Sequence, residues 1–260
     1  MEKIDILSLS PETLGQYLAE MGEPKFRAKQ LFSWLHQKQV TDFAQMTTLS
    51  LQLRQKLNEK FCINRLNIAR KLASSADDTV KYLYELPDGN FVETVLMDYH
   101  HGKSLCISTQ VGRRMGCQFC ASTIAGYVRD LQPSELLLQI YETQRDAGCR
   151  IDSIVLMGIG EPLDNFDNVV QFFRLLSHPD GMNMSLRHAA LSTCGLVPQI
   201  RQLADLRLGV TLSVSLHSPE NQRRSEIMPV NRRYPVEELL DACRYYFDTT
   251  GRRVTIEYAV

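Results

Sequence analysis

Apolar residues recur with a helical period over the first sixty residues. The first predicted helix follows Ser10-Pro11, a capping residue and a first-turn proline, and ends before Gly22 and Pro24. Its apolar face is formed by residues three or four positions apart: Leu14, Tyr17, Leu18 and Met21. The same spacing predicts a second helix, with Ala28, Leu31, Phe32 and Leu35 on one face, and a third through Leu53 and Leu57. We therefore expect residues 1–62 to form a small helical domain.

A period of two replaces the helical period between residues 63 and 100. Residues 80–86 and 91–97 alternate as strands do and flank Pro87-Asp88-Gly89-Asn90, a strong turn sequence. This connector is predicted to form a β-hairpin. Glu93 shares one face of its second strand with apolar residues, an environment that favours proton uptake near neutral pH. The same pattern is more typical of a glutamate at the solvated rim of a sheet.

From residue 101 onward, short apolar strands alternate with amphipathic helices. The strands are expected at residues 105–108, 153–157, 189–192, 210–215 and 254–259, and the helices at 133–147, 166–176, 198–204 and 236–249. Alternating strands and helices indicate an α/β fold with a parallel sheet, either doubly wound or a barrel. Side chains that could carry chemistry follow four of the strands: Cys117 and Cys120; Gly160 and Glu161; Ser192; Ser215, Leu216 and His217. In a barrel, those loops form the ligand-binding end.

Composition adds limits to this picture. The 260 residues are 44% hydrophobic and 23% charged, with a net charge of −1, so any contact with nucleic acid has to rest on local basic patches. Candidate patches are Lys25-Phe-Arg27-Ala-Lys29 and the pairs Arg113-Arg114, Arg223-Arg224, Arg232-Arg233 and Arg252-Arg253, although each is also typical of a solvated surface. The odd number of cysteines, seven, and the absence of a signal-like or membrane-spanning run favour a reducing, cytoplasmic location without a membrane partner.

The loop after residue 106 departs by one position from an iron–sulfur motif. If Arg113 were a cysteine, residues 113–120 would read CxxxCxxC, a spacing at which three thiolates can hold a [4Fe-4S] cluster with one iron open. Only Cys117 and Cys120 remain, and a cation occupies the first position. A CxxC pair by itself is also half of a zinc site or a redox dithiol, but no second pair supports zinc.

This near-motif, followed one strand later by Gly160-Glu161-Pro162, resembles the radical S-adenosylmethionine (SAM) superfamily. Further segments resemble the adenine-C2 RNA methyltransferases that modify ribosomal and transfer RNA, and their antibiotic-resistance relatives that methylate C8: residues 24–32, 92–95, 106–112, 215–219 and 227–231. The resemblance implies a partial (β/α) radical SAM barrel over residues 101–260, preceded by the helical domain and the hairpin. It also implies a [4Fe-4S] cluster, SAM, an electron donor such as flavodoxin, and RNA docking by residues 1–62.

The resemblance also assigns roles to individual residues. Cys117 and Cys120 correspond to cluster ligands, Glu93 to the base that removes the ring proton, and Cys106 to the cysteine that displaces the thioether as a disulfide. The expected SAM contacts are Gly160, Glu161, Ser192, Ser215, Leu216 and His217. The methyl-carrying cysteine of the family has no counterpart here and is expected beyond residue 260, which would leave the barrel incomplete at its C-terminal end.

Two interpretations remain open at this stage. The chain is either an adenine methyltransferase, with C8 as the alternative position, or a catalytically silent, truncated homologue that retains only RNA binding. Arg113 favours the second interpretation, because a protonated guanidinium offers no lone pair to iron. The SAM-contact motifs favour the first.

Overall fold

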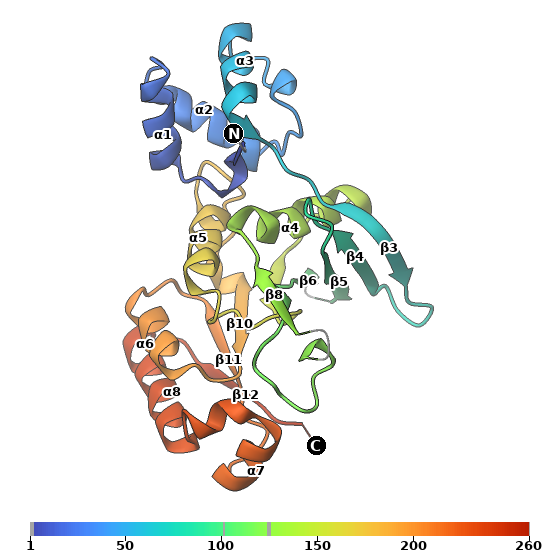
Figure 1. Ribbon diagram of the computed structural model, residues 1–260, viewed down its shortest axis with the longest axis vertical. Coiled ribbons are helices and arrows are strands. Elements are labelled where there is room, and N and C mark those ends of the chain that lie inside the picture. Colours follow the sequence, from blue (N-terminus) through green and yellow to red (C-terminus); the bar gives the residue numbers. More distant parts are fainter. Residues whose placement is uncertain (1–2, 101, 124–125, 260) are drawn as a thin grey trace.

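The computed structural model describes residues 3–100, 102–123 and 126–259. The three predicted N-terminal helices are present as α1 (Pro11–Glu20), α2 (Phe26–His36) and α3 (Leu51–Lys60). Ser10 caps the first of them, since its Oγ accepts a hydrogen bond from the Thr13 amide at 3.2 Å. The short strands β1 (Ile4–Asp5) and β2 (Phe61–Cys62) pair in parallel and bring the two ends of this module together. The module lies at the top of Figure 1, above α4 and α5.

One eight-stranded sheet runs through the rest of the molecule. Its parallel part consists of β6 (Gly102–Cys106), β9 (Ser153–Leu156), β10 (Ala189–Thr193), β11 (Thr211–Ser215) and β12 (Val254–Glu257). Beyond β6 the sheet continues as antiparallel strands: β5 (Phe91–Tyr99), β4 (Val80–Glu85) and β3 (Asn67–Ala73). This open sheet of strands alternating with helices confirms the predicted α/β partial barrel, and the predicted hairpin extends the same sheet.

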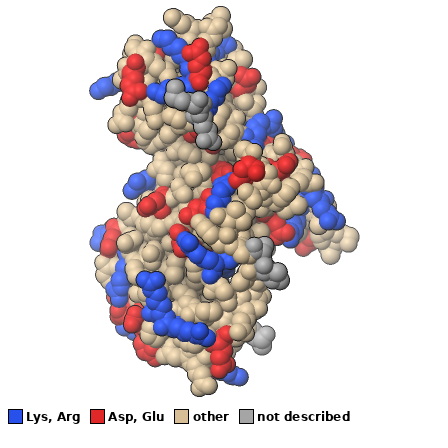
Figure 2. All heavy atoms as spheres, in the orientation of Figure 1, with Lys and Arg blue, Asp and Glu red and all other residues tan. Residues whose placement is uncertain are grey.

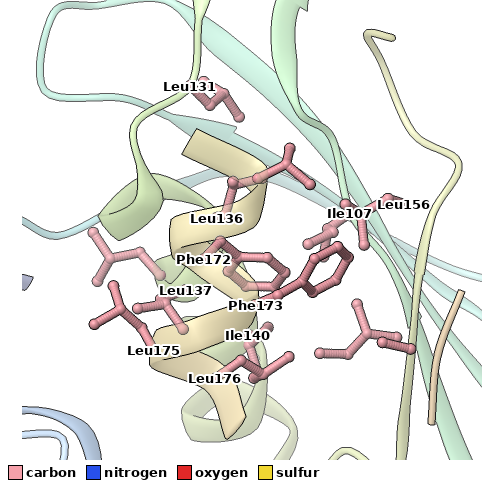
Figure 3. Packing of buried hydrophobic residues seen from close by; sticks show 14 of the residues in the cluster. Ile107, Leu131, Leu136, Leu137, Ile140, Leu156, Phe172, Phe173, Leu175 and Leu176 are labelled. Carbon is pink, nitrogen blue, oxygen red and sulfur yellow. The ribbon is translucent and has the colours of Figure 1, made fainter. Parts of the chain in front are cut away.

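Helices α4 (Pro133–Ala147), α5 (Phe166–Ser177), α6 (Val197–Asp205) and α8 (Val236–Thr250) connect the parallel strands and pack on one face of the sheet. Figure 3 shows the centre of this packing, where Phe172 and Phe173 of α5 meet Leu136 and Ile140 of α4 beside Leu156 of β9. The central strand residues that point toward the helices, such as Leu105, Ile154, Leu191 and Leu212, are apolar and completely buried, because the hydrophobic effect favours removal of that surface from water.

The opposite face of the sheet carries the polar strand residues. The register aligns Val95 with Cys106, Ser192 with Ser213, and Ser215 with Glu257, and residues aligned in neighbouring strands point to the same side. Glu93 lies two residues before Val95 and therefore shares this face. The register thus brings the expected site residues of β5, β6, β10 and β11 to one uncovered face.

Several elements were not predicted from the sequence. They include the edge strand β3, whose seven residues are all exposed, a small sheet of β7 (Gln110–Gly112) and β8 (Tyr127–Asp130), α7 (Asn221–Ile227), and short 3-10 turns at residues 6–8, 43–45, 121–123, 186–188 and 229–232. These segments are short or lack a buried stripe. Their backbone conformation depends on pairing with distant segments, for which the local sequence gives no signal.

Candidate active site at the carboxyl edge of the sheet

Glu161 lies at the centre of the loops that follow the parallel strands. Its side chain is fully buried, and its carboxylate accepts hydrogen bonds from the Cys194 amide at 2.9 Å and the Leu163 amide at 3.3 Å. The preceding residue, Gly160, has a φ of +113°, and an added Cβ would lie 2.6 Å from Thr109 Oγ1 and 2.7 Å from the Gln110 amide nitrogen. Only glycine permits this approach of the loop after β9 to the segment after β6. Glu161 therefore ties together the loops after β9 and β10.

Arg113, on the loop after β6, contacts the Glu161 carboxylate. Its Nη2 donates to Glu161 Oε2 at 2.9 Å, and its side chain is 17% exposed. Burial opposes the charged guanidinium, but the adjacent Glu161 carboxylate outweighs this effect, and the pKa of Arg113 is raised. The conformation of this loop requires glycine at position 112, because an added Cβ would lie 1.7 Å from the Gly126 carbonyl oxygen. Arg113 is thus held as a buried cation paired with Glu161.

The two cysteines of the near-motif lie beside this ion pair. Cys117 packs with Cys194 and Met228 in a small apolar cluster, against which Met115 and Cys120 also pack. Burial raises the pKa of the Cys117 thiol and raises that of Cys194 well above its usual value, so both are protonated near neutral pH. Cys194 lies next to Glu161, to which its amide donates.

This donor set does not fit a [4Fe-4S] cluster held by three protein thiolates. At the first ligand position stands Arg113, which cannot donate an electron pair to iron and is already paired with Glu161. In the described ranges, no group of three or more histidine, cysteine, aspartate or glutamate side chains is arranged to hold a metal ion. The residues present therefore cannot hold such a cluster in the manner of the three-cysteine motif.

Hydroxyl groups and a carboxylate line the ends of β10, β11 and β12. Ser192 Oγ donates to the Glu257 carboxylate at 3.0 Å, and Ser215 Oγ donates to the same group at 2.8 Å. Near Gly160, the buried Thr109 Oγ1 has no hydrogen-bond partner among the described residues. Hydroxyl, carboxylate and unpartnered polar atoms at one sheet edge suit a ligand with several polar groups, as SAM is. Glu257 had not been singled out from the sequence.

Leu216 and His217 continue this edge beyond β11. Both of their amides donate to the Glu257 carbonyl, at 3.1 and 3.2 Å. His217 has a φ of +56°, and its Nδ1 accepts a hydrogen bond from the Ala259 amide at 3.1 Å. Burial lowers the pKa of His217, so its ring is neutral near pH 7. Its ring meets that of Phe119 edge to face, with 4.8 Å between centroids, which connects the cysteine loop to the end of β11.

Arg224 of α7 holds the loops after β10 and β11 together. Because it is buried, its side chain is not available to RNA. It is completely buried, and its guanidinium donates to the carbonyls of Cys194 at 2.7 Å, Ser215 at 3.1 Å and Leu216 at 3.1 Å. By its place in the pair Arg223-Arg224, Arg224 was expected at the surface. The wrong expectation arose because a charged residue is rarely buried unless several acceptors surround it, and those acceptors come from distant loops.

Glu93 and Cys106 lie on adjacent strands at the uncovered face. Ser108, just after β6, donates from its Oγ to the Glu93 carbonyl at 2.6 Å, which holds the two strands together here. Glu93 is 41% exposed and forms an ion pair with Lys81 at 2.7 Å, so of the two environments that its sequence pattern allowed, it has the solvated rim and not the apolar enclosure. Burial raises the pKa of the Cys106 thiol, while a backbone hydrogen bond from Met157 acts in the opposite direction.

The basic residues of the N-terminal module are only partly available for a partner. Lys29 pairs with Asp180 at 2.9 Å, and Arg27 donates to Gln30 at 2.7 Å, whereas the adjacent Phe26 is 57% exposed. Figure 2 shows lysine and arginine side chains interspersed with acidic ones over the face drawn, rather than gathered into one field. None of the helices in the described part of the chain combines the length and the apolar character needed to cross a lipid bilayer.

Comparisons with known proteins agree with this architecture. Residues 4–63 match the family model of the ribosomal RNA large subunit methyltransferase N-terminal domain, and residues 107–260 match that of the radical SAM superfamily. The probable dual-specificity RNA methyltransferase RlmN of Lachnospira eligens is 51% identical over 256 residues, which cover 98% of this chain and 73% of the relative. Its counterpart in Alkaliphilus oremlandii is 51% identical over 260 residues, 100% of this chain and 76% of the relative. The crystal structure of a radical SAM methyltransferase from Sphaerobacter thermophilus superposes with a TM-score of 0.92 at 39% identity, covering 98% of this chain and 76% of that one.

Proposed function

Because this chain belongs to the RlmN family of radical SAM RNA methyltransferases, we propose that its site is arranged for methylation of C2 of a specific adenine in ribosomal RNA and in transfer RNA, through a methyl-cysteine intermediate, and that the reaction requires a cysteine in place of Arg113. The observation that carries the proposal is the common face of Glu93 and Cys106, which lie on adjacent strands and point to the side of the sheet left free by the helices. An adenine held over this face would meet both groups at once.

Glu93 is proposed to remove the proton from the modified ring carbon. Its exposed carboxylate can reach a bound base, and the ion pair with Lys81 at 2.7 Å fixes the position of the side chain on this face. Cys106 is proposed to release the RNA by attack of its thiolate on the sulfur of the methyl-carrying cysteine. The S–S bond of a disulfide forms while the S–C bond to the RNA breaks, and the electron pair of that bond stays on the methylene carbon, which takes up a proton and becomes the methyl group. Since burial raises the pKa of Cys106, the thiol must lose its proton before this attack.

The edge formed by Gly160, Ser192, Ser215, Leu216 and His217 is proposed to hold SAM. When bound, SAM supplies the methyl group. Glu161 contributes indirectly in this chain, because its carboxylate is occupied by Arg113 and two backbone amides and therefore fixes the loops. Residues 1–62, with the exposed Phe26 between two basic residues, are proposed as the RNA-docking module, residues 63–100 as the connector and residues 101–260 as the barrel domain.

A second candidate function is RNA binding without turnover. The Arg113–Glu161 ion pair favours it, since a cation fills the position of a cluster ligand and is stabilised there by the protein itself. The electron donor expected of the family, such as flavodoxin, would then have no acceptor in this chain.

Mass spectrometry of nucleosides distinguishes the candidates. The unaltered chain and Arg113→Cys, both extended by the corresponding C-terminal segment of the Lachnospira eligens relative, are expressed in cells that lack endogenous 2-methyladenosine. We expect 2-methyladenosine in ribosomal and transfer RNA with Arg113→Cys, and its loss when Glu93→Gln is added, because an amide cannot accept the ring proton. Formation of 8-methyladenosine would instead indicate the C8 relative, and RNA binding without either product would indicate the silent homologue.

A further inference from the structure

Glu257 occupies the end of β12 beside two residues of the proposed SAM edge. In the parallel register its backbone aligns with Ser215, and its side chain is half-buried on the uncovered face. The carboxylate receives hydrogen bonds from Ser192 across β11 and from Ser215 on the neighbouring strand. Its carbonyl also holds the amides of Leu216 and His217. Glu257 therefore contacts most of this edge through both its side chain and its backbone.

These hydrogen bonds determine which groups the edge can recognise. A serine hydroxyl has a single proton to donate, and both Ser192 and Ser215 donate theirs to Glu257. Toward a ligand, the two serines therefore present lone pairs. The carboxylate adds a negative charge and further lone pairs, and in the described ranges its side-chain partners are neutral hydroxyls rather than a lysine or an arginine. The edge is thus an acceptor surface.

An acceptor surface does not suit the carboxylate of SAM. The carboxylate of SAM would face the Glu257 carboxylate and two hydroxyls whose protons are already donated. The like charges would repel each other at hydrogen-bond distance. A ribose offers two adjacent hydroxyl donors and no charge. Acidic side chains at the carboxyl edge of parallel sheets bind ribose hydroxyls in this way in dinucleotide-binding folds.

We propose that Glu257 binds the ribose of the adenosyl ligand, accepting hydrogen bonds from its 2′ and 3′ hydroxyls while Ser192 and Ser215 hold the carboxylate in place. This proposal rests on the SAM edge assigned above and names a ligand-binding residue and a ligand group there. The amino-acid end of SAM then lies away from Glu257, toward Gly160 and the unpartnered Thr109 hydroxyl.

Calorimetry with a ligand that needs no cluster tests the proposal on the chain as it exists. The probes are 5′-methylthioadenosine, which has the ribose diol but no amino acid, and its 2′,3′-dideoxy analogue. Glu257→Gln keeps the size of the side chain but loses the charge and one acceptor. We expect it to weaken binding of methylthioadenosine by at least about tenfold, the effect of losing one hydrogen bond to a charged group. The same variant should change binding of the dideoxy analogue by less than about twofold.

The matched control is Glu238→Gln, an exposed carboxylate on α8, which should leave both affinities unchanged. Equal losses for the two probes in Glu257→Gln would show that Glu257 only orders the serines, and unchanged binding of methylthioadenosine would show that it does not touch the ligand. Failure of the unaltered protein to bind methylthioadenosine would also overturn the proposal. RNA methylation is judged by its own nucleoside assay, so the two proposals can fail separately.

Discussion

At the scale of single residues, Arg113 decides the chemistry of the loop after β6. A cysteine at this position would supply a ligand, whereas the arginine supplies a counter-ion for the fully buried Glu161. Removing one partner of a buried ion pair leaves an uncompensated charge, and this commonly costs about 3–5 kcal/mol. The two backbone amides that also bind Glu161 reduce the loss toward the lower end of that range.

We therefore expect opposite effects of Arg113→Cys on two measurements. The free energy of unfolding without iron should fall by about 3 kcal/mol, while anaerobic reconstitution should yield iron–sulfur absorbance and about four irons per chain, the content of one [4Fe-4S] cluster. Arg114→Cys is the matched control, because it adds a thiol one position away and removes only a half-exposed pair with Asp164 at 2.7 Å. Stoichiometric iron in the unaltered chain would refute the assigned role of Arg113.

At the scale of elements, the N-terminal module is attached to the barrel through α2 and α4. His36 of α2 is completely buried against Phe32, and its Nδ1 lies 3.0 Å from the Tyr141 hydroxyl of α4. Its Nε2 has no partner among the described residues. Burial, with a smaller contribution from His178, lowers the pKa of His36 to about 3. The interface is thus built around a neutral imidazole.

This arrangement predicts a loss of stability in acid. The unfolded chain takes up a proton on His36 below its ordinary pKa of 6.5, whereas the folded protein does so only near 3, so stability present above pH 6.5 is lost as the pH falls toward 3. At pH 5 the contribution amounts to about 2 kcal/mol. Urea unfolding at pH 7 and pH 5 should show this difference in the unaltered protein and a smaller one in His36→Gln. The exposed His188→Gln should behave as the unaltered protein, and an equal pH dependence in His36→Gln would contradict the interpretation.

At the scale of the whole molecule, charge limits how the protein can hold RNA. The net charge is −1, and on the face drawn in Figure 2 basic side chains are interspersed with acidic ones, so affinity on this face cannot come from one extended positive field. The N-terminal module, proposed above to dock RNA, and α7 lie at opposite ends of the molecule in Figure 1. Local contacts at one end should therefore be separable from those at the other.

The salt dependence of RNA binding tests this separation. We expect a shallow dependence of the logarithm of affinity on the logarithm of salt concentration, equivalent to only a few phosphate contacts. Replacing Lys25 and Lys29 together by glutamine should reduce the slope by about one to two. The pair Arg223→Gln and Arg232→Gln at the far end serves as the control. If the slope were unchanged by the lysine substitutions and reduced by the arginine substitutions, the RNA-docking surface would lie near α7 instead of on the N-terminal module.

The sequence alone determined the elements whose signals are local. Helical periodicity with caps located α1 and α4, and the turn at residues 87–90 located the hairpin, because these features depend on neighbours a few residues apart. The order of strands and helices also determined the parallel sheet, and the motif spacing identified the loops that converge at its carboxyl edge.

Only the tertiary structure decided how those loops meet. Glu161 pairs with Arg113, the buried Arg224 binds loop carbonyls, and Glu257 accepts hydrogen bonds from Ser192 and Ser215. These contacts join residues about 30 to 65 positions apart in the sequence. Glu93 was placed in an ion pair with Lys81 instead of an apolar enclosure. Charged residues carry no local pattern that distinguishes solvent from a buried partner, because the free energy of a buried charge depends on the groups that the fold brings to it.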